Sequence, residues 1–280
     1  MGAEKILRER IEETAAKAGA KSAAVAFHDY ETDRHFTYRG DEWMHAASTI
    51  KVPVLVGVFG AIEDHELTLG SRVHVRNRFY SAVDGTAYRV ESGRDANSEV
   101  HAYIGKTMKL GDLARHMIVT SSNLATNLLL DAVGIERVRQ TLEELGVRGV
   151  ELRRGVEDER AFEEGINNRV SADGLVQVLR LIEERKALSA RACEQMLEIL
   201  HAQEFRSGIP AGLPDDARVA NKTGEISTAA HDTGLIYLPR RQPYALAILT
   251  EWEAERTAGR RDALANISRL VYEHLTEGRR

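Results

Sequence analysis

The sequence is poor in the residues that build disulfides and metal sites. Its 280 residues include one cysteine, Cys193, so no internal disulfide can form. That cysteine falls in a helical pattern, where we expect a small buried side chain rather than a reactive thiol. Ten histidines are present, but none forms a His-x-His or His-x-x-x-His pair beside a cluster of carboxylates. We therefore expect neither a metal ion nor another cofactor.

Long apolar runs and blocks of one charge are also lacking. The apolar stretch 52–62 is too short to span a membrane and contains Pro53. The net charge is −5 with both signs spread along the chain, which argues against nucleic acid as a partner. A composition of 43% hydrophobic and 29% charged residues is typical of a globular protein of one or two domains. We expect a monomer that binds neither nucleic acid nor a membrane.

The N-terminal residues do not resemble a signal peptide. Residues 3–18 alternate Glu, Lys and Arg with apolar side chains and stop at Gly19, which predicts an amphipathic helix. Two interpretations follow: the protein stays in the cytoplasm, or the chain is the mature form of an exported protein. The compartment is left open.

One apolar segment carries a serine and a lysine suited to catalysis. Residues 46–59 read Ala-Ala-Ser-Thr-Ile-Lys-Val-Pro-Val-Leu-Val-Gly-Val-Phe, and the apolar side chains surround the helix they predict, so it should be buried. Ser48 and Lys51 are three residues apart and share one helix face. Burial makes a lysine amine a usable base, and such a base can activate a serine hydroxyl. Alone, the pair could equally be a helix N-cap followed by a lysine that reaches solvent.

Apolar periodicity predicts strands at both ends of the chain and helices between them. The strands are expected at 23–28, 35–38, 218–223, 233–238 and 244–250. The helices are expected at 3–18, 49–63, 110–119, 123–132, 135–145, 171–185, 189–201 and 255–276. This order predicts an α+β fold, with an antiparallel sheet flanked by the terminal helices and an inserted helical subdomain. We expect residues 1–45 and 204–280 to form the sheet subdomain and 46–203 the helical one, with the site in the cleft between them.

Two further motifs support a catalytic role for the serine and lysine pair. Ser121-Ser122-Asn123 lies between two predicted helices, and Lys222-Thr223-Gly224 lies on a predicted strand near the C-terminus. Ser-x-x-Lys, Ser-Asp-Asn and Lys-Thr-Gly in this order are typical of class A β-lactamases and penicillin-binding proteins. The chain resembles that superfamily of penicillin-recognising serine hydrolases from about residue 3 to about residue 277. It departs from the pattern at the middle of the second motif, where serine stands in place of aspartate.

The resemblance implies roles for the residues around the serine. Ser48 would be the nucleophile and Lys51 its base or proton shuttle. The N–H of Ser48, at a helix start, would form half of an oxyanion hole, and that of Glu225 the other half. Ser121 would relay a proton to the leaving nitrogen, and Asn123 would hold the lysine or the substrate amide; both could also be helix caps.

The third motif would bind the substrate from one strand edge. Lys222 and Thr223 would bind a substrate carboxylate, and Gly224 would let the substrate backbone approach closely. On the next strand, His231 and Asp232 could buttress this edge or form an ordinary surface pair.

The loop 152–168 is where class A enzymes carry the glutamate of deacylation, within Glu-x-x-Leu-Asn. Here Glu157 lies at a suitable distance from the second motif, but Arg160-Ala161 replaces Leu-Asn. We predict Glu157 as the base, with Asp158 as an alternative. Three successive acids could also be an ordinary solvated loop.

Residues 72–107 form a long polar stretch with little periodicity, which we interpret as an insertion over the mouth of the cleft. Its aromatic residues, Phe79, Tyr80 and Tyr88, could stack on a substrate or pin the loop. Three functions remain open. The chain could be a class A type hydrolase of β-lactams, a peptidase or esterase of the same fold, or a sensor that stays acylated.

Overall fold

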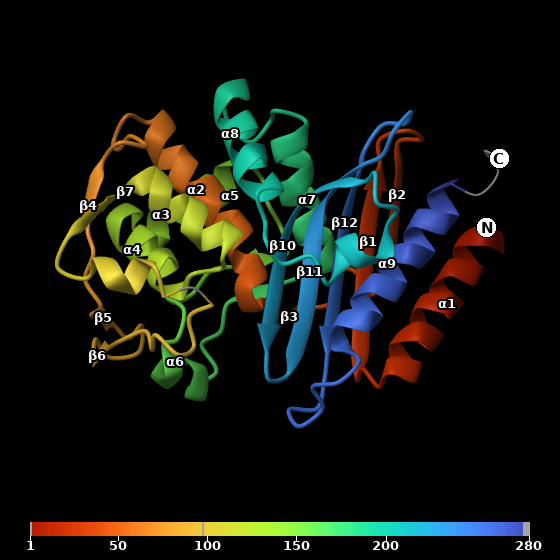
Figure 1. The fold of residues 1–280 in the computed structure, drawn as a ribbon, viewed down its shortest axis with the longest axis horizontal. Helices are drawn as coiled ribbons and strands as arrows, with labels where there is room; N and C mark the ends of the chain where they lie inside the picture. The colour runs from red at the N-terminus through yellow and green to blue at the C-terminus, as the bar shows by residue number, and fades with distance from the viewer. Residues whose placement is uncertain (1, 97, 277–280) are drawn as a thin grey trace.

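A five-stranded antiparallel sheet forms the centre of one half of the molecule (Figure 1). The computed structural model describes residues 2–96 and 98–276. The sheet is ordered β10 (Arg218–Ile226), β11 (Ala229–Tyr237), β12 (Tyr244–Glu251), β1 (Ser22–Asp29) and β2 (Arg34–Tyr38). The first and last thirds of the chain thus meet through the pairing of β1 with β12.

The two terminal helices cover the outer face of this sheet. Helix α1 (Gly2–Ala18) packs along α9 (Arg260–Thr276), and Figure 1 shows them side by side at one end of the molecule. Side chains alternate along a strand, so Val25 and Phe27 of β1 enter this outer core. The helices α1 and α9 cover this face from one side only, so each of them buries a single apolar stripe.

The inner face of the sheet is built from small side chains. Ala24 and Ala26 of β1 and Ala245 and Ala247 of β12 belong to the inner core. Their size allows α7 (Ala172–Glu183) to pack directly against both strands. One hydrophobic core therefore joins the sheet to the helices, and the predicted division at residues 45 and 203 stays a prediction.

Helix α2 (Lys51–Glu63) lies at the middle of the helical half. Each of its residues from Lys51 to Ala61 is buried, which confirms the burial expected from its composition. It is surrounded by α3 (Leu110–Val119), α4 (Asn123–Val133), α5 (Ile135–Glu144), α7 and α8 (Ala190–His201). Serine side chains cap three of the helices by accepting a backbone N–H, as helix starts require: Ser122, Ser171 and Ser189. This arrangement confirms the predicted α+β fold.

The 72–107 segment contains two short two-stranded sheets and packs against the helical half. Strand β4 (Arg72–His74) pairs with β7 (Thr107–Lys109), and β5 (Phe79–Tyr80) with β6 (Ala87–Tyr88). A 3-10 turn at Val100–Tyr103 follows. The segment is anchored by four buried apolar side chains: Val75, Phe79, Val90 and Val100. Phe79 is thus a core residue, which fits the pinning alternative.

Several short elements were not predicted. Strands β3 (Met44–His45), β9 (Arg169–Val170) and β8 (Val150–Glu151) form a small sheet, and α6 (Glu159–Glu163) is a single turn. Two-residue strands carry no periodicity that a sequence can reveal. Helix α9 begins later than predicted, after Gly259, whose φ of +82° only glycine adopts readily.

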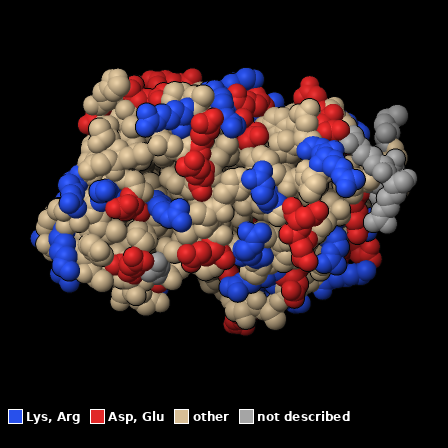
Figure 2. Space-filling model, turned by 45° about the horizontal axis from the view of Figure 1, so that its top comes forward, with Lys and Arg blue, Asp and Glu red and all other residues tan. Residues whose placement is uncertain are grey.

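Among residues 2–96 and 98–276, no helix is both long and apolar enough to cross a membrane. Figure 2 shows lysine and arginine side chains interspersed with aspartate and glutamate on one face of the molecule.

Candidate active site

Ser48 lies in a tight turn between the small sheet and the buried helix α2. The turn is a 3-10 helix, Ala47–Ile50, which continues directly into α2. Ala47 has a φ of +45°, a left-handed conformation that is strained for a residue with a side chain. The turn is fixed by His45, whose Nδ1 accepts the Ala47 N–H at 3.0 Å, and by Thr49, whose hydroxyl donates to Ala46 O at 2.6 Å. The half-buried serine lines a cleft that also contains Ser121, Asn123, Thr223 and Gly224.

Lys51 is fully buried and bonded to the second motif. Its Nζ donates to Ser121 O at 2.7 Å, to Asn123 Oδ1 at 2.7 Å and to Ser121 Oγ at 3.2 Å. Burial lowers the pKa of Lys51 to about 7, while the negative charges of Asp95 and Glu157 act in the opposite direction. Near neutral pH a large fraction of the amine is therefore unprotonated and able to accept a proton.

Ser121 lies between two buried lysines. Its Oγ accepts from Lys222 Nζ at 2.9 Å as well as from Lys51. Burial lowers the pKa of Lys222 well below its ordinary value, and the nearby Lys51 charge lowers it further, whereas Asp232 raises it. Because two like charges disfavour each other at this range, the two lysines do not readily carry a positive charge at the same time. The N-cap of α4 is Ser122, so the capping alternative for Ser121 is wrong; its role as a proton relay stays a prediction.

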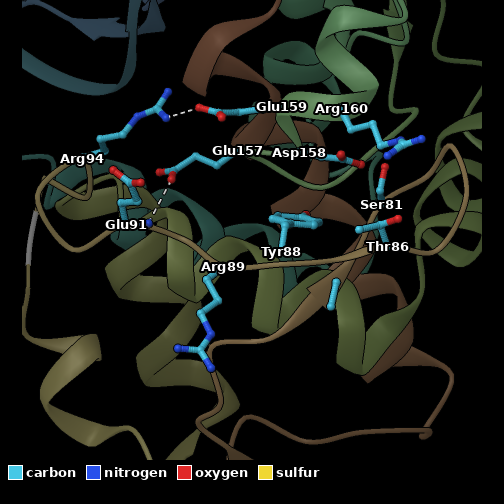
Figure 3. A pocket seen from close by; sticks show the side chains of 11 residues that line it. Ser81, Thr86, Tyr88, Arg89, Glu91, Arg94, Glu157, Asp158, Glu159 and Arg160 are labelled. Atoms are coloured by element: carbon cyan, nitrogen blue, oxygen red, sulfur yellow. Dashed lines mark hydrogen bonds and ion pairs between the residues drawn. The ribbon is translucent and has the colours of Figure 1, made fainter.

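Asn123 connects the lysine to the loop acid. Its Oδ1 accepts from Lys51, and its Nδ2 donates to Glu157 Oε1 at 2.6 Å. The other oxygen of Glu157 accepts the N–H of Glu91 at 3.1 Å, shown as a dashed line in Figure 3. Glu157 has a φ of +59°, an uncommon conformation that often marks functional positions. The structure thus joins Glu157 to the Ser48 cleft through a single side chain.

Asp158 points away from Glu157, as Figure 3 shows, and its hydrogen bonds stabilise the loop. It is buried, its Oδ1 caps α6 at Ala161 N, and its Oδ2 accepts from Ala82 N at 2.8 Å. Both carboxylate oxygens are occupied by backbone donors. Of the two acids, Glu157 is the one hydrogen-bonded to the second motif, through Asn123; which of them acts as a base stays a prediction.

The third motif lies on β10, beside the turn Ala47–Ile50 that carries Ser48. A Cβ on Gly224 would come within 3.0 Å of both Ser48 N and Thr49 N, so only glycine lets the strand approach this closely. Thr223 and Glu225 line the same cleft, whose volume is about 250 Å³. Glu225 is exposed and pairs with Arg261 of α9 at 3.2 Å.

The pair on β11 buttresses the site. His231 Nδ1 accepts from Thr250 N, so its Nε2 carries the proton and donates to His45 O at 2.9 Å. Asp232 is buried and accepts from Asn221 Nδ2 at 2.9 Å, and burial raises its pKa to about 6. The His231 contact ties β11 to β3, the strand before the turn that carries Ser48. The Asp232 contact ties β11 to β10. Both fit the buttress alternative.

Three charged residues at the site were missed from sequence. Arg94 and Arg261 line the cleft, and Asp95 lies with its carboxylate fully buried at the start of α4. Arg94 also pairs with Glu159, drawn in Figure 3. Arg94 and Asp95 belong to the aperiodic 72–107 segment, where nothing in the residue pattern distinguishes them. Among residues 2–96 and 98–276, no three His, Cys, Asp or Glu side chains are grouped to hold a metal ion.

Comparison with known proteins places these features in context. The model of the beta-lactamase enzyme family matches residues 5–275. The chain is 29% identical over 236 residues to a beta-lactamase of Bacillus licheniformis, covering 79% of this chain and 69% of that protein. It is 25% identical over 247 residues to beta-lactamase AER-1 of Aeromonas hydrophila, covering 85% and 76%. A match to a beta-lactamase of Bacteroides uniformis, 26% identical over 179 residues, spans 60% of each protein.

Solved structures with the same fold include both beta-lactamases and a penicillin-binding protein. An ancestral class A beta-lactamase superposes with a TM-score of 0.81 at 26% identity, covering 95% of this chain and 99% of that one. A beta-lactamase of Sphaerobacter thermophilus gives 0.80 at 25% identity, with 95% and 96% covered. PBP-A gives 0.82 at 24% identity, with 97% and 96% covered, and a mutant of it was solved as an acyl-enzyme complex with penicillin G.

Proposed function

Because the chain belongs to the beta-lactamase enzyme family, we propose that it is a serine hydrolase that opens β-lactam amides through an acyl-enzyme on Ser48. The observation that carries the proposal is the buried chain of contacts beside this serine. Lys51 Nζ lies 3.2 Å from Ser121 Oγ, which in turn lies 2.9 Å from Lys222 Nζ. A neutral lysine and a shared hydroxyl are the groups that acyl transfer to a serine requires.

Acylation begins with transfer of the Ser48 hydroxyl proton toward the amine of Lys51, one helical turn away. The serine oxygen attacks the lactam carbonyl, and the N–H groups of Ser48 and Glu225 hold the resulting oxyanion. The proton taken up by Lys51 passes through the Ser121 hydroxyl to the lactam nitrogen as the C–N bond breaks, and Lys222 keeps that hydroxyl in place. The burial of both lysines supports this route, because it removes the cost of deprotonating an exposed amine.

The cleft suits a substrate that carries a carboxylate. Thr223 lines it and is followed in the motif by Gly224 and preceded by the buried Lys222. Arg94 of the 72–107 segment and Arg261 of α9 also line the cleft and add positive charge. Guanidinium and hydroxyl groups bind carboxylates through charge-assisted hydrogen bonds. We assign carboxylate binding to Thr223 and Lys222, with Arg261 of α9 as an additional donor released from Glu225.

Deacylation requires a base that activates water, and Glu157 is the group we assign. It reaches the site through Asn123 and lines a second pocket of about 130 Å³, which shares Arg94 with the cleft. One observation favours a second candidate function, a penicillin-binding protein that stays acylated. Both Glu157 oxygens already accept hydrogen bonds, and Ala161 stands where the family pattern has asparagine.

Intact-protein mass spectrometry with a penicillin over time, beside a nitrocefin assay, separates the candidates. An adduct that forms and then disappears, together with nitrocefin turnover, supports the hydrolase. An adduct that persists supports the penicillin-binding protein. No adduct and no turnover with any β-lactam overturns both and leaves a peptidase or esterase.

A further inference from the structure

Asp95 brings a carboxylate from the 72–107 segment to the start of helix α4. Its side chain is 0% exposed. Its Oδ1 accepts from Asn123 N at 2.9 Å, and its Oδ2 accepts from Leu124 N at 3.1 Å and from Ser122 Oγ at 3.0 Å. His101 lies 3.1 Å from the same Oδ2. These contacts satisfy backbone donors that a helix start leaves without a partner.

Ser122 alone cannot accept all the backbone N–H groups at the start of α4. It is the N-cap of α4, and its hydroxyl accepts only the Ala125 N–H, at 3.2 Å, while donating its proton to Asp95. Without Asp95 the N–H groups of Asn123 and Leu124 would lose their acceptor, although Leu124 is fully buried. An unsatisfied buried donor costs roughly 1–3 kcal/mol. In the motif Ser-Asp-Asn, an aspartate occupies the position of Ser122, and an aspartate at an N-cap can accept such N–H groups with its own carboxylate.

We propose that Asp95 is a positioning residue of the active site, supplying from the neighbouring segment the carboxylate that the second motif lacks. Its contacts fix the first turn of α4, and with it the side chains of Ser121 and Asn123 that bond to Lys51. The 72–107 segment is then part of the catalytic structure rather than a cover over it. The proposal rests on the proposed function only in its use of acylation as a readout.

The charge of Asp95 also acts on the lysine. Lys51 faces negative charge from Asp95 and Glu157 and positive charge from Lys222, and His101 lies against Asp95 itself. Asp95 raises the pKa of Lys51 against the effect of burial. Removing this charge moves the lysine's titration to lower pH, so the acid limb of the acylation profile follows it. A residue that only stabilised the fold would leave that limb where it is.

The test compares Asp95→Asn with a repair at the motif position. The rate at which a fluorescent penicillin or a fluorophosphonate probe labels Ser48 is measured in wild type, in Asp95→Asn and in Asp95→Asn/Ser122→Asp. We expect the single variant to lose about ten- to a hundred-fold, the effect of displacing catalytic groups by about 1 Å, and the repaired variant to recover most of it. The control is Asp84→Asn in the same segment, which removes the charge paired with Arg160, keeps an oxygen for the Thr86 N–H, and should label at the wild-type rate.

Amide hydrogen exchange provides a readout that needs no substrate. The Leu124 N–H, whose acceptor Oδ2 becomes an NH2 group, should exchange faster in Asp95→Asn and recover protection in the repaired variant. Labelling and exchange both unchanged in Asp95→Asn overturn the proposal. If Asp95→Asn does not fold, Ser122→Asp must restore folding and labelling, and a repaired variant that fails in either overturns it. A wild-type protein that no probe labels refutes the proposed function instead, while the exchange result still decides the role of Asp95.

Discussion

At the scale of single residues, the account depends on Lys51 being a base rather than a cation. Its amine is surrounded by hydrogen-bond partners and excluded from water. A lysine in such a place either loses its proton or needs a fixed counter-charge. Glu157 and Asp95 supply negative charge that does not fully offset burial, which leaves the pKa of Lys51 at about 7.

The acylation rate should therefore rise with pH through about 7, because the lysine is protonated and inactive below its pKa and neutral above it. Glu157→Gln removes a charge that raises this pKa, so its profile should be displaced to lower pH. The measurement is the rate of Ser48 labelling from pH 5 to pH 9. A flat profile in wild type, or one displaced upward in the variant, would contradict the role of Lys51.

Glu157→Gln should also let acyl-enzyme accumulate, because a well-placed general base contributes about a hundred- to ten-thousand-fold to rate. Pre-steady-state traces with a chromogenic cephalosporin should show a burst followed by a much slower phase. Asp158→Asn is the matched control; its amide oxygen can still cap α6, but its NH2 cannot accept the Ala82 N–H, so it should instead lower stability by about 1–3 kcal/mol. A deacylation rate changed less than a few-fold in Glu157→Gln would favour the protein that stays acylated.

At the scale of elements, the close contact of β10 with the turn Ala47–Ile50 constrains the position of Ser48. A methyl group on Gly224 would press on Ser48 N, Thr49 N and the Ala47 side chain. Gly224→Ala should slow labelling of Ser48 by about ten-fold or more, since the turn must shift to admit it. Gly93→Ala, whose added methyl has no heavy atom within 4 Å, serves as the control. Equal labelling rates in the two variants would show that this contact does not position the serine.

The elements differ in how far the sequence could predict them. Helix α3 lies at Leu110–Val119, as predicted, because its apolar stripe and its ends are both clear. Strand β11 begins at Ala229, four residues before its predicted start, because the buried His231 and Asp232 read as polar loop residues. Their burial depends on partners in other strands, which no local pattern can show.

The residues of the candidate site also differ in how far the sequence could predict them. The spacing of Ser48 and Lys51 and the two later motifs indicated the central residues, since each motif has its own local signature. Glu157 was predicted from its distance along the chain, and its role stays a prediction. Asp95 could not be found, because its partners are 27 to 29 residues away in the chain and meet it only in the folded protein.

At the scale of the whole molecule, one core joins the sheet to the helices through α7. We therefore expect a single cooperative unfolding transition, with far-UV circular dichroism and Trp252 fluorescence changing together in a Trp43→Phe background. Leu179→Ala in α7 should lower the free energy of unfolding by about 2–5 kcal/mol in both signals. Ile6→Ala, at an exposed position, should have a much smaller effect. Two separate transitions would instead support independent subdomains.

The central claim is that one serine, Ser48, carries the acyl group. The direct measurement is peptide mapping by mass spectrometry after brief exposure of wild type, Ser48→Ala and Ser207→Ala to a penicillin. Ser207 lines the same cleft and is the matched control. We expect the adduct on the peptide containing Ser48 in wild type and in Ser207→Ala, and no adduct in Ser48→Ala at an unchanged melting temperature. An adduct on Ser121 or elsewhere, or undiminished labelling of Ser48→Ala, would contradict the account.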